Sequence, residues 1–113
     1  MEPSQQPVIF VVEDNLIYQS LIAKELESLS KNIHFYTTGE SCLDDLAKAP
    51  SVIVLDYNLD GEMNGLDTLQ KVRDIDPDVY VILFSSQKGL KPTTPQIVDQ
   101  IKQIEKYISR IPG

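Results

Sequence analysis

The chain has 113 residues, of which 42% are hydrophobic and 24% charged, and its net charge is −7. This length and composition fit one globular domain and exclude a wholly disordered chain, and the acidic balance argues against binding to a nucleic-acid backbone, which requires a basic surface. The single cysteine excludes an internal disulfide, and no apolar run is long enough to span a bilayer, so we expect a cytoplasmic protein that is not embedded in a membrane.

Four short segments rich in β-branched and aromatic residues are predicted strands, and they cover residues 8–12, 33–36, 51–55 and 79–84. Three of them are continuous apolar runs, which indicates strands that are buried on both faces of a parallel sheet. The segment 33–36 is less apolar and fits an edge strand. Helical patterns lie between the strands, and this alternation predicts an α/β layer fold with right-handed crossovers.

Apolar residues at helical spacing follow each of the first three strands, so each is expected to lead into a helix with one buried face. The repeating positions are Tyr18, Ile22, Leu26 and Leu29 in the first helix, Leu43, Leu46 and Ala47 in the second, and Leu66, Leu69 and Val72 in the third.

Carboxylate side chains follow two of the apolar strands. Glu13 and Asp14 come directly after residues 8–12, and Asp56 comes directly after residues 51–55. Ligands of open parallel sheets bind beyond the carboxyl ends of the strands, so neighbouring strands here would place three carboxylates in one pocket. Their mutual repulsion favours a bound hard cation, and a set of oxygen ligands without Cys or His suits Mg²⁺ rather than Zn²⁺.

Such a pocket is suited to phosphoryl transfer. Asp56 is the candidate nucleophile, because an aspartate can form an aspartyl-phosphate. Glu13 and Asp14 would hold the metal, and the backbone carbonyl of Asn58 could complete its ligands. The hydroxyl of Ser85, directly after the fourth strand, could bind a phosphoryl oxygen.

A simpler interpretation is that polar residues after strands serve as helix caps. Asp14 or Asn15 could cap the first helix in this way. That interpretation accounts for one residue at a time and leaves the joint pattern unexplained.

Four segments together resemble the receiver domain of two-component response regulators. They are Val-Val-Glu-Asp-Asn at 11–15, Val-Ile-Val-Leu-Asp-Tyr-Asn-Leu at 52–59, Met-Asn-Gly-Leu at 63–66, and Val-Ile-Leu-Phe-Ser-Ser at 81–86. The resemblance implies a flavodoxin-like (CheY-like) doubly wound parallel sheet, here with four strands in the order 2-1-3-4.

The same resemblance implies roles for individual residues. Asp56 would be the phosphoacceptor, and Ser85 would be a switch hydroxyl. Mg²⁺ would be held by Glu13, Asp14, Asp56 and the Asn58 carbonyl. The phosphoryl donor would be a histidine kinase or a histidine phosphotransfer protein.

The chain departs from the resemblance after residue 86. Receiver domains place a lysine, usually followed by proline, at the end of a fifth strand, and Lys91-Pro92 resembles this pair. Only five residues, 86–90, separate the pair from Ser85, which is too few for a helix and a parallel strand. We therefore predict one domain over 1–113, with a flexible N-terminus over 1–7, a receiver core over 8–86 and a shortened part over 87–113.

Two interpretations of the C-terminal part remain open. Isoleucines recur at positions 97, 101, 104, 108 and 111, which predicts one amphipathic helix from about Pro95 onward. Alternatively, residues 95–103 form the fourth helix and residues 106–110 form the fifth strand. The phosphoryl contact would then come from Arg110 instead of Lys91, and Lys88 is a further candidate.

Our leading hypothesis is a receiver that signals through contacts with an unidentified target protein. The fourth strand, 79–84, would form an apolar edge that pairs in a homodimer unless another element covers it. A second hypothesis is a non-phosphorylated interaction module with a receiver-like shape. A third is a haloacid-dehalogenase-like phosphatase, but that family requires a second aspartate where Asn58 stands.

Overall fold

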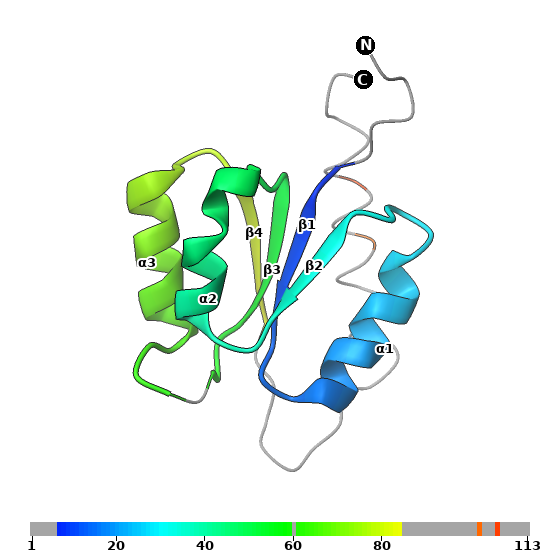
Figure 1. Ribbon diagram of the computed structural model, residues 1–113, viewed down its shortest axis with the longest axis horizontal. Coiled ribbons are helices and arrows are strands. Elements are labelled where there is room, and N and C mark those ends of the chain that lie inside the picture. Colours follow the sequence, from blue (N-terminus) through cyan, green and yellow to red (C-terminus); the bar gives the residue numbers. More distant parts are fainter. Residues whose placement is uncertain (1–6, 60, 85–101, 103–105, 107–113) are drawn as a thin grey trace.

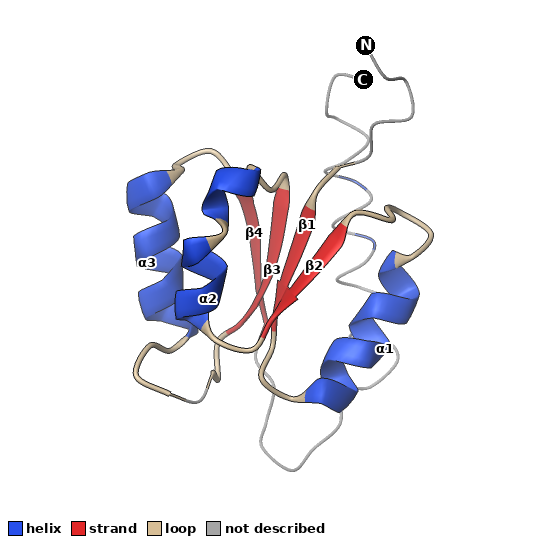
Figure 2. Cartoon of the chain, in the orientation of Figure 1, coloured by secondary structure: helices blue, strands red, loops and turns tan. Residues whose placement is uncertain are grey.

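A sheet of four parallel strands forms the centre of the part of the chain that the structure, a computed structural model, describes: residues 7–59 and 61–84, with Lys102 and Lys106. The strands are β1 (Ile9–Val12), β2 (Ile33–Tyr36), β3 (Val52–Asp56) and β4 (Tyr80–Phe84). Their order is β2-β1-β3-β4, as predicted, so β2 and β4 are the two edges of the described sheet (Figure 2).

Helices cover both faces of this sheet, which makes the fold doubly wound (Figure 1). Helix α1 (Leu16–Leu26) lies on one face. Helices α2 (Gly39–Asp44) and α3 (Gly65–Ile75) lie on the other, and a short 3₁₀ helix (Leu46–Lys48) follows α2. The arrangement is the flavodoxin-like architecture that the sequence predicted.

Alternate residues of each strand point to opposite faces, so the core has two halves. On the α1 face, Ile22 and Leu26 pack against the strands, and Tyr18 continues the same buried face of the helix toward its N-terminus. Burial of such apolar surface is the dominant favourable term in folding. The buried residues of this half are Ile9, Val11, Ile22, Leu26, Val52, Val54 and Ile82.

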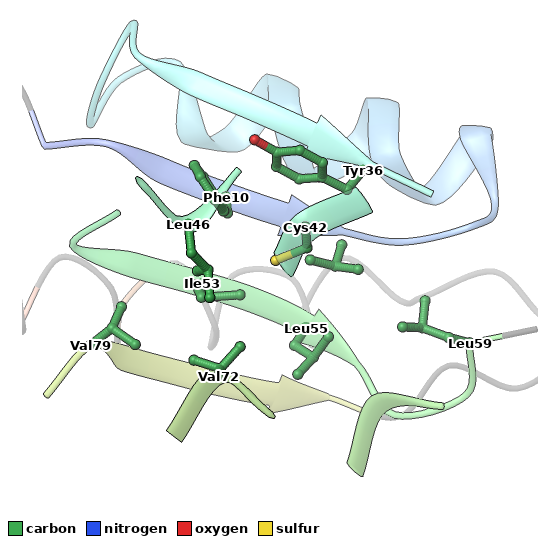
Figure 3. Close-up of a cluster of buried hydrophobic side chains, with 10 residues drawn as sticks. Phe10, Tyr36, Cys42, Leu46, Ile53, Leu55, Leu59, Val72 and Val79 are labelled. Carbon is green, nitrogen blue, oxygen red and sulfur yellow. The ribbon is translucent and has the colours of Figure 1, made fainter. Parts of the chain in front are cut away.

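The second half of the core lies between the sheet and helices α2 and α3 (Figure 3). Phe10 and Tyr36 pack with ring centroids 4.8 Å apart. The hydroxyl of Tyr36 donates a hydrogen bond to Oδ2 of Asp45 over 2.8 Å. Tyr36 therefore joins the edge strand β2 to the segment directly after α2. Cys42 of α2 is fully buried in this half and forms no disulfide.

Two of the predicted helix faces were partly wrong. Leu66 was expected in the core, but its side chain is 42% exposed, and Ala47 is also exposed. Thr68 is fully buried instead. Its hydroxyl donates a hydrogen bond to the carbonyl of Asn64 over 2.8 Å, so the buried polar group is satisfied. The side chain of Thr68 also lies against Gly39, where a Cβ atom would collide with its Oγ1 atom. Gly39 of α2 and Thr68 of α3 therefore form a close contact between the two helices.

Several predictions concern residues that the structure does not describe. They include most of the amphipathic helix from Pro95, most of the alternative fifth strand over 106–110, and the flexible segment 1–7 except for Pro7. Of the C-terminal part, only Lys102 and Lys106 are described, and both are helical and exposed. A helical Lys106 agrees with the amphipathic helix and not with a strand that starts at that residue.

Among the described helices, none has the length and apolar character needed to cross a membrane.

The buried thiol gives a test of this core. Burial raises the pKa of Cys42 to about 12. Because the thiolate is the reactive form, we expect native protein at pH 8 to react with iodoacetamide at least about tenfold more slowly than protein unfolded in guanidinium chloride. Cys42 is the only cysteine, so intact mass reports it alone. Equal rates in the two states would contradict the packing.

The same pKa shift predicts a pH dependence of stability. The folded state binds the proton of the Cys42 thiol more tightly than the unfolded state does. The resulting contribution to the free energy of unfolding is fully present below the ordinary pKa of 9.0. This contribution is lost as the pH rises from there toward about 12. In Cys42→Ala the free energy of unfolding should therefore fall less steeply over that alkaline range.

Candidate functional site

Three carboxylate side chains meet at the edge of the sheet where the strands end. One oxygen from each of Glu13, Asp14 and Asp56 lies within 4.8 Å of the other two. Glu13 and Asp56 have no exposed surface, and Asp14 is half-buried. The grouping that the sequence predicted is therefore present in the fold.

The strand register explains why these residues meet. β1 pairs with β3 in parallel, and Val12 is the partner of Leu55. Glu13 follows Val12 and Asp56 follows Leu55, so both carboxylates leave the same edge of two neighbouring strands. A shift of the register by one residue would exchange the faces of one whole strand, which the buried core prevents.

Hydrogen bonds on three sides fix Glu13. Its backbone N–H donates to the carbonyl of Tyr36 in β2 over 2.9 Å. Its carboxylate Oε2 accepts the backbone N–H of Asn15 over 2.9 Å, and its own carbonyl accepts Nε2 of Gln19 over 3.2 Å. Its second carboxylate oxygen, Oε1, is buried and has no hydrogen-bond partner among the described residues.

The surroundings of Glu13 make its charged form costly. Burial raises its pKa to about 9, and the neighbouring carboxyl groups of Asp14 and Asp56 act in the same direction. The N–H of Asn15 partly opposes this effect. These surroundings therefore favour the neutral form of Glu13, and a cation beside the cluster would favour the charged form.

Asn15 is the residue that caps α1. Its side-chain oxygen accepts the N–H groups of Ile17 over 2.9 Å and of Tyr18 over 3.2 Å. The capping interpretation is thus correct for Asn15, and it does not account for the position of Asp14 within the carboxylate cluster.

Asp56 is oriented by its own loop. The N–H of Asn58 donates to Oδ1 of Asp56 over 2.9 Å, which mirrors the bond from Asn15 to Glu13. Each buried carboxylate thus accepts a hydrogen bond from the backbone two residues further on. Asn58 is half-buried beside the cluster, and a ligand role for its carbonyl stays a prediction.

The donor set fits a hard divalent cation. All three side chains offer carboxylate oxygens, and the buried Oε1 of Glu13 is an acceptor that no hydrogen bond among the described residues satisfies. An Mg²⁺ ion prefers such oxygen ligands. Ser85 and Lys91, as well as the alternatives Lys88 and Arg110, lie outside the described residues, so their predicted roles stay predictions.

Gly65 is a residue whose role the sequence did not reveal, although it belongs to a motif quoted above. It opens α3 and lies against the loop that carries Asp56, and its N–H donates to the carbonyl of Tyr57 over 3.1 Å. A Cβ atom there would approach Cα of Tyr57 to 2.5 Å and would collide with the carbonyl oxygen of Asp56. Only glycine permits this contact without movement of the backbone.

Comparisons with known proteins agree with this geometry. The family model of the response regulator receiver domain matches residues 9–109. The match extends beyond residue 86, where the sequence motifs of the resemblance end. A CheY-like response regulator receiver domain protein from Methanospirillum hungatei superposes with a TM-score of 0.78 at 17% identity, over 93% of this chain and 95% of that one. At this low identity the superposition supports the fold alone.

Two curated relatives are similar in sequence. The protein-glutamate methylesterase/protein-glutamine glutaminase of Clostridium acetobutylicum is 38% identical over 91 residues, which cover 75% of this chain and 26% of the relative. The transcriptional regulatory protein CssR of Bacillus subtilis is 32% identical over 79 residues, which cover 70% of this chain and 35% of the relative. The chain thus spans only about a quarter to a third of the length of these proteins.

The contact at Gly65 gives a test of how the site is held. Gly65→Ala should destabilise the fold by about 1–3 kcal/mol, as overpacking of a tight contact does, because α3 must move away from the Asp56 loop. Urea unfolding measures this change. Gln70→Ala, at an exposed position of the same helix, is the control and should be nearly neutral. Equal stability of the two variants would contradict the close contact.

Proposed function

The chain belongs to the response regulator receiver family, and on that premise we propose that Asp56 accepts a phosphoryl group with Mg²⁺ as cofactor. The donor is a phosphohistidine of a histidine kinase or of a histidine phosphotransfer protein. The observation that carries the proposal is the position of Asp56, which is buried at the carboxyl edge of the sheet within 4.8 Å of two further carboxylates.

The covalent step is a transfer between two nucleophiles. A carboxylate oxygen of Asp56 forms a bond to phosphorus, the phosphorus–nitrogen bond of the phosphohistidine breaks, and its electron pair returns to the imidazole nitrogen. The product is an acyl phosphate on Asp56 and a free histidine on the donor. Water later attacks the phosphorus, which restores the carboxylate and releases inorganic phosphate.

The residues around Asp56 prepare it for this step. The N–H of Asn58 fixes one carboxylate oxygen, so the group does not rotate freely. Glu13 and Asp14 would hold the cation together with Asp56, and the Asn58 carbonyl would be a further ligand. A bound Mg²⁺ supplies positive charge that offsets the charge of the phosphoryl oxygens and of the three carboxylates.

Two further residues complete the proposed site from their positions in the sequence. Ser85 directly follows Phe84, the residue that pairs with Asp56 across β3 and β4. Its hydroxyl is our proposed switch group, which binds a phosphoryl oxygen. Lys91 is the proposed cationic contact to the phosphoryl group.

Signal output proceeds through protein contacts in this proposal. The fourth strand is an edge of the described sheet, and Leu83 in it is 39% exposed. We propose that two copies of the chain form a homodimer by pairing their β4 strands along this edge. The transcriptional regulation and the methylesterase or glutaminase activity that the names of the relatives state belong to those longer proteins.

The rival hypotheses have less support. A non-phosphorylated interaction module has no need to keep three carboxylates together with two of them buried. A haloacid-dehalogenase-like phosphatase disagrees with the family match, and Asn58 stands where its second aspartate is required.

Phosphorylation is tested directly with a small phosphodonor. Incubation of the wild type with acetyl phosphate and Mg²⁺ should add the mass of one phosphoryl group, and Asp56→Asn should add none because the nucleophile is gone. Intact mass spectrometry measures both. An unmodified wild type, or undiminished modification of Asp56→Asn, would reject Asp56 as the acceptor.

Cation binding is tested separately from the chemistry. Mg²⁺ at about a hundred times its Kd should stabilise the wild type by about 2.7 kcal/mol, seen as a higher Tm. Asp14→Asn should lose most of this stabilisation, because it removes one carboxylate of the cluster. Asp74→Asn, the same substitution at an exposed position of α3, should keep it. A wild type that is indifferent to Mg²⁺ would support the interaction module instead.

A further inference from the structure

Gln19 connects helix α1 to the chain segment that carries the acidic cluster. Its side-chain Nε2 donates to the carbonyl oxygen of Glu13 over 3.2 Å, and its backbone N–H donates to the carbonyl of Asn15 over 3.0 Å. One half-buried residue, in the second turn of the helix, thus contacts both ends of the turn between β1 and α1.

Asp14, which lies between those two ends, is the least buried member of the cluster. It forms a bend that belongs neither to β1 nor to α1, and it is half-buried whereas Glu13 and Asp56 are fully buried. The carbonyl of Glu13 and the N–H of Asp14 belong to the same planar peptide unit. A hydrogen bond to that carbonyl therefore also fixes the direction in which the chain enters Asp14.

We infer that Gln19 is a positioning residue that holds the Glu13–Asp14 peptide in the geometry of the carboxylate cluster. This inference rests on the proposed function, since it makes Gln19 a determinant of cation affinity. The segment is anchored by the backbone hydrogen bond from Glu13 to Tyr36 and by the cap that the side chain of Asn15 forms on α1. Gln19 adds a side-chain bond between those anchors, directly on the peptide that leads into Asp14.

The start of α1 does not depend on this hydrogen bond, because the helix already has its N-cap from Asn15. A residue that only stabilised the helix would not need a hydrogen bond to the carbonyl of Glu13, which precedes the helix. A methionine at this position would keep the length and the helix propensity of glutamine but would lack the donor.

The experiment compares Gln19→Met with the wild type in two measurements. In metal-free protein, amide hydrogen exchange of Asn15 reports the bend, because this N–H is bonded to Oε2 of Glu13. We expect faster exchange at Asn15 in the variant, with exchange of Val54 in the middle of β3 as the internal reference. In Mg²⁺ titrations we expect the Kd to rise about two- to tenfold, the range for loss of one neutral hydrogen bond.

Gln70→Met is the matched control, because it makes the same substitution at an exposed site on α3. It should change neither measurement. If Gln19→Met lowers Tm but leaves the Mg²⁺ affinity and the Asn15 exchange as in the wild type, Gln19 has a structural role only and the inference is overturned.

The two proposals fail in different ways. A wild type that binds no Mg²⁺ refutes the proposed function, but the exchange of Asn15 still decides whether Gln19 holds the bend. A wild type that binds Mg²⁺ as tightly as Gln19→Met does, with equal exchange at Asn15, refutes the inference about Gln19 and leaves the proposed function standing.

Discussion

Two carboxyl groups without solvent exposure, those of Glu13 and Asp56, are the constraint around which this domain is built. Burial of ionisable groups is unfavourable unless they are neutralised, paired or hydrogen-bonded. The two apolar halves of the core, above and below the sheet, provide the favourable burial that offsets this cost. A fold selected for stability alone would place apolar side chains at these positions, so the carboxylates point to a function.

The same local hydrogen bond, formed in two places, reduces the free-energy cost of burying these two carboxyl groups. Glu13 and Asp56 each accept the N–H of the residue two positions further on, Asn15 and Asn58. The bonds orient both carboxylates from within their own loops and leave Oε1 of Glu13 without a partner among the described residues. The geometry of the cluster therefore depends on the two loops, and contacts from α1 and α3 hold those loops in place.

Much of the fold and of the cluster could be predicted from the sequence, because the signals are local. Continuous apolar runs predicted β1, β3 and β4, and the carboxylates that follow two of them predicted the cluster. The predicted set of four strands in the order 2-1-3-4 agrees with the described sheet. These properties follow from strand burial and from the rule that ligands bind beyond the strand ends.

The contacts that hold the site could not be predicted in the same way, because they join elements that are separate in the sequence. Leucine periodicity placed Leu66 in the core, whereas α3 buries Thr68 against Gly39 of α2. Gly65 appeared in a motif, but its close contact with the Asp56 loop depends on where α3 packs. The bond from Gln19 to Glu13 depends on a side-chain rotamer, which no hydrophobic pattern encodes.

The positions at which the strands stop pairing show how the sheet places the carboxylate cluster. Pairing between β1 and β3 ends at Val12 and Leu55, whereas pairing between β3 and β4 continues by one residue, to Asp56 and Phe84. Asp56 is thus paired with β4 on one side. On its other side, Glu13 no longer pairs with β3, because the pairing of β1 with β3 ends at Val12. Glu13 therefore lies on the flank of Asp56 where the pairing of β1 with β3 has ended. Opposite that flank, the backbone of Asp56 pairs with Phe84 at the end of β4.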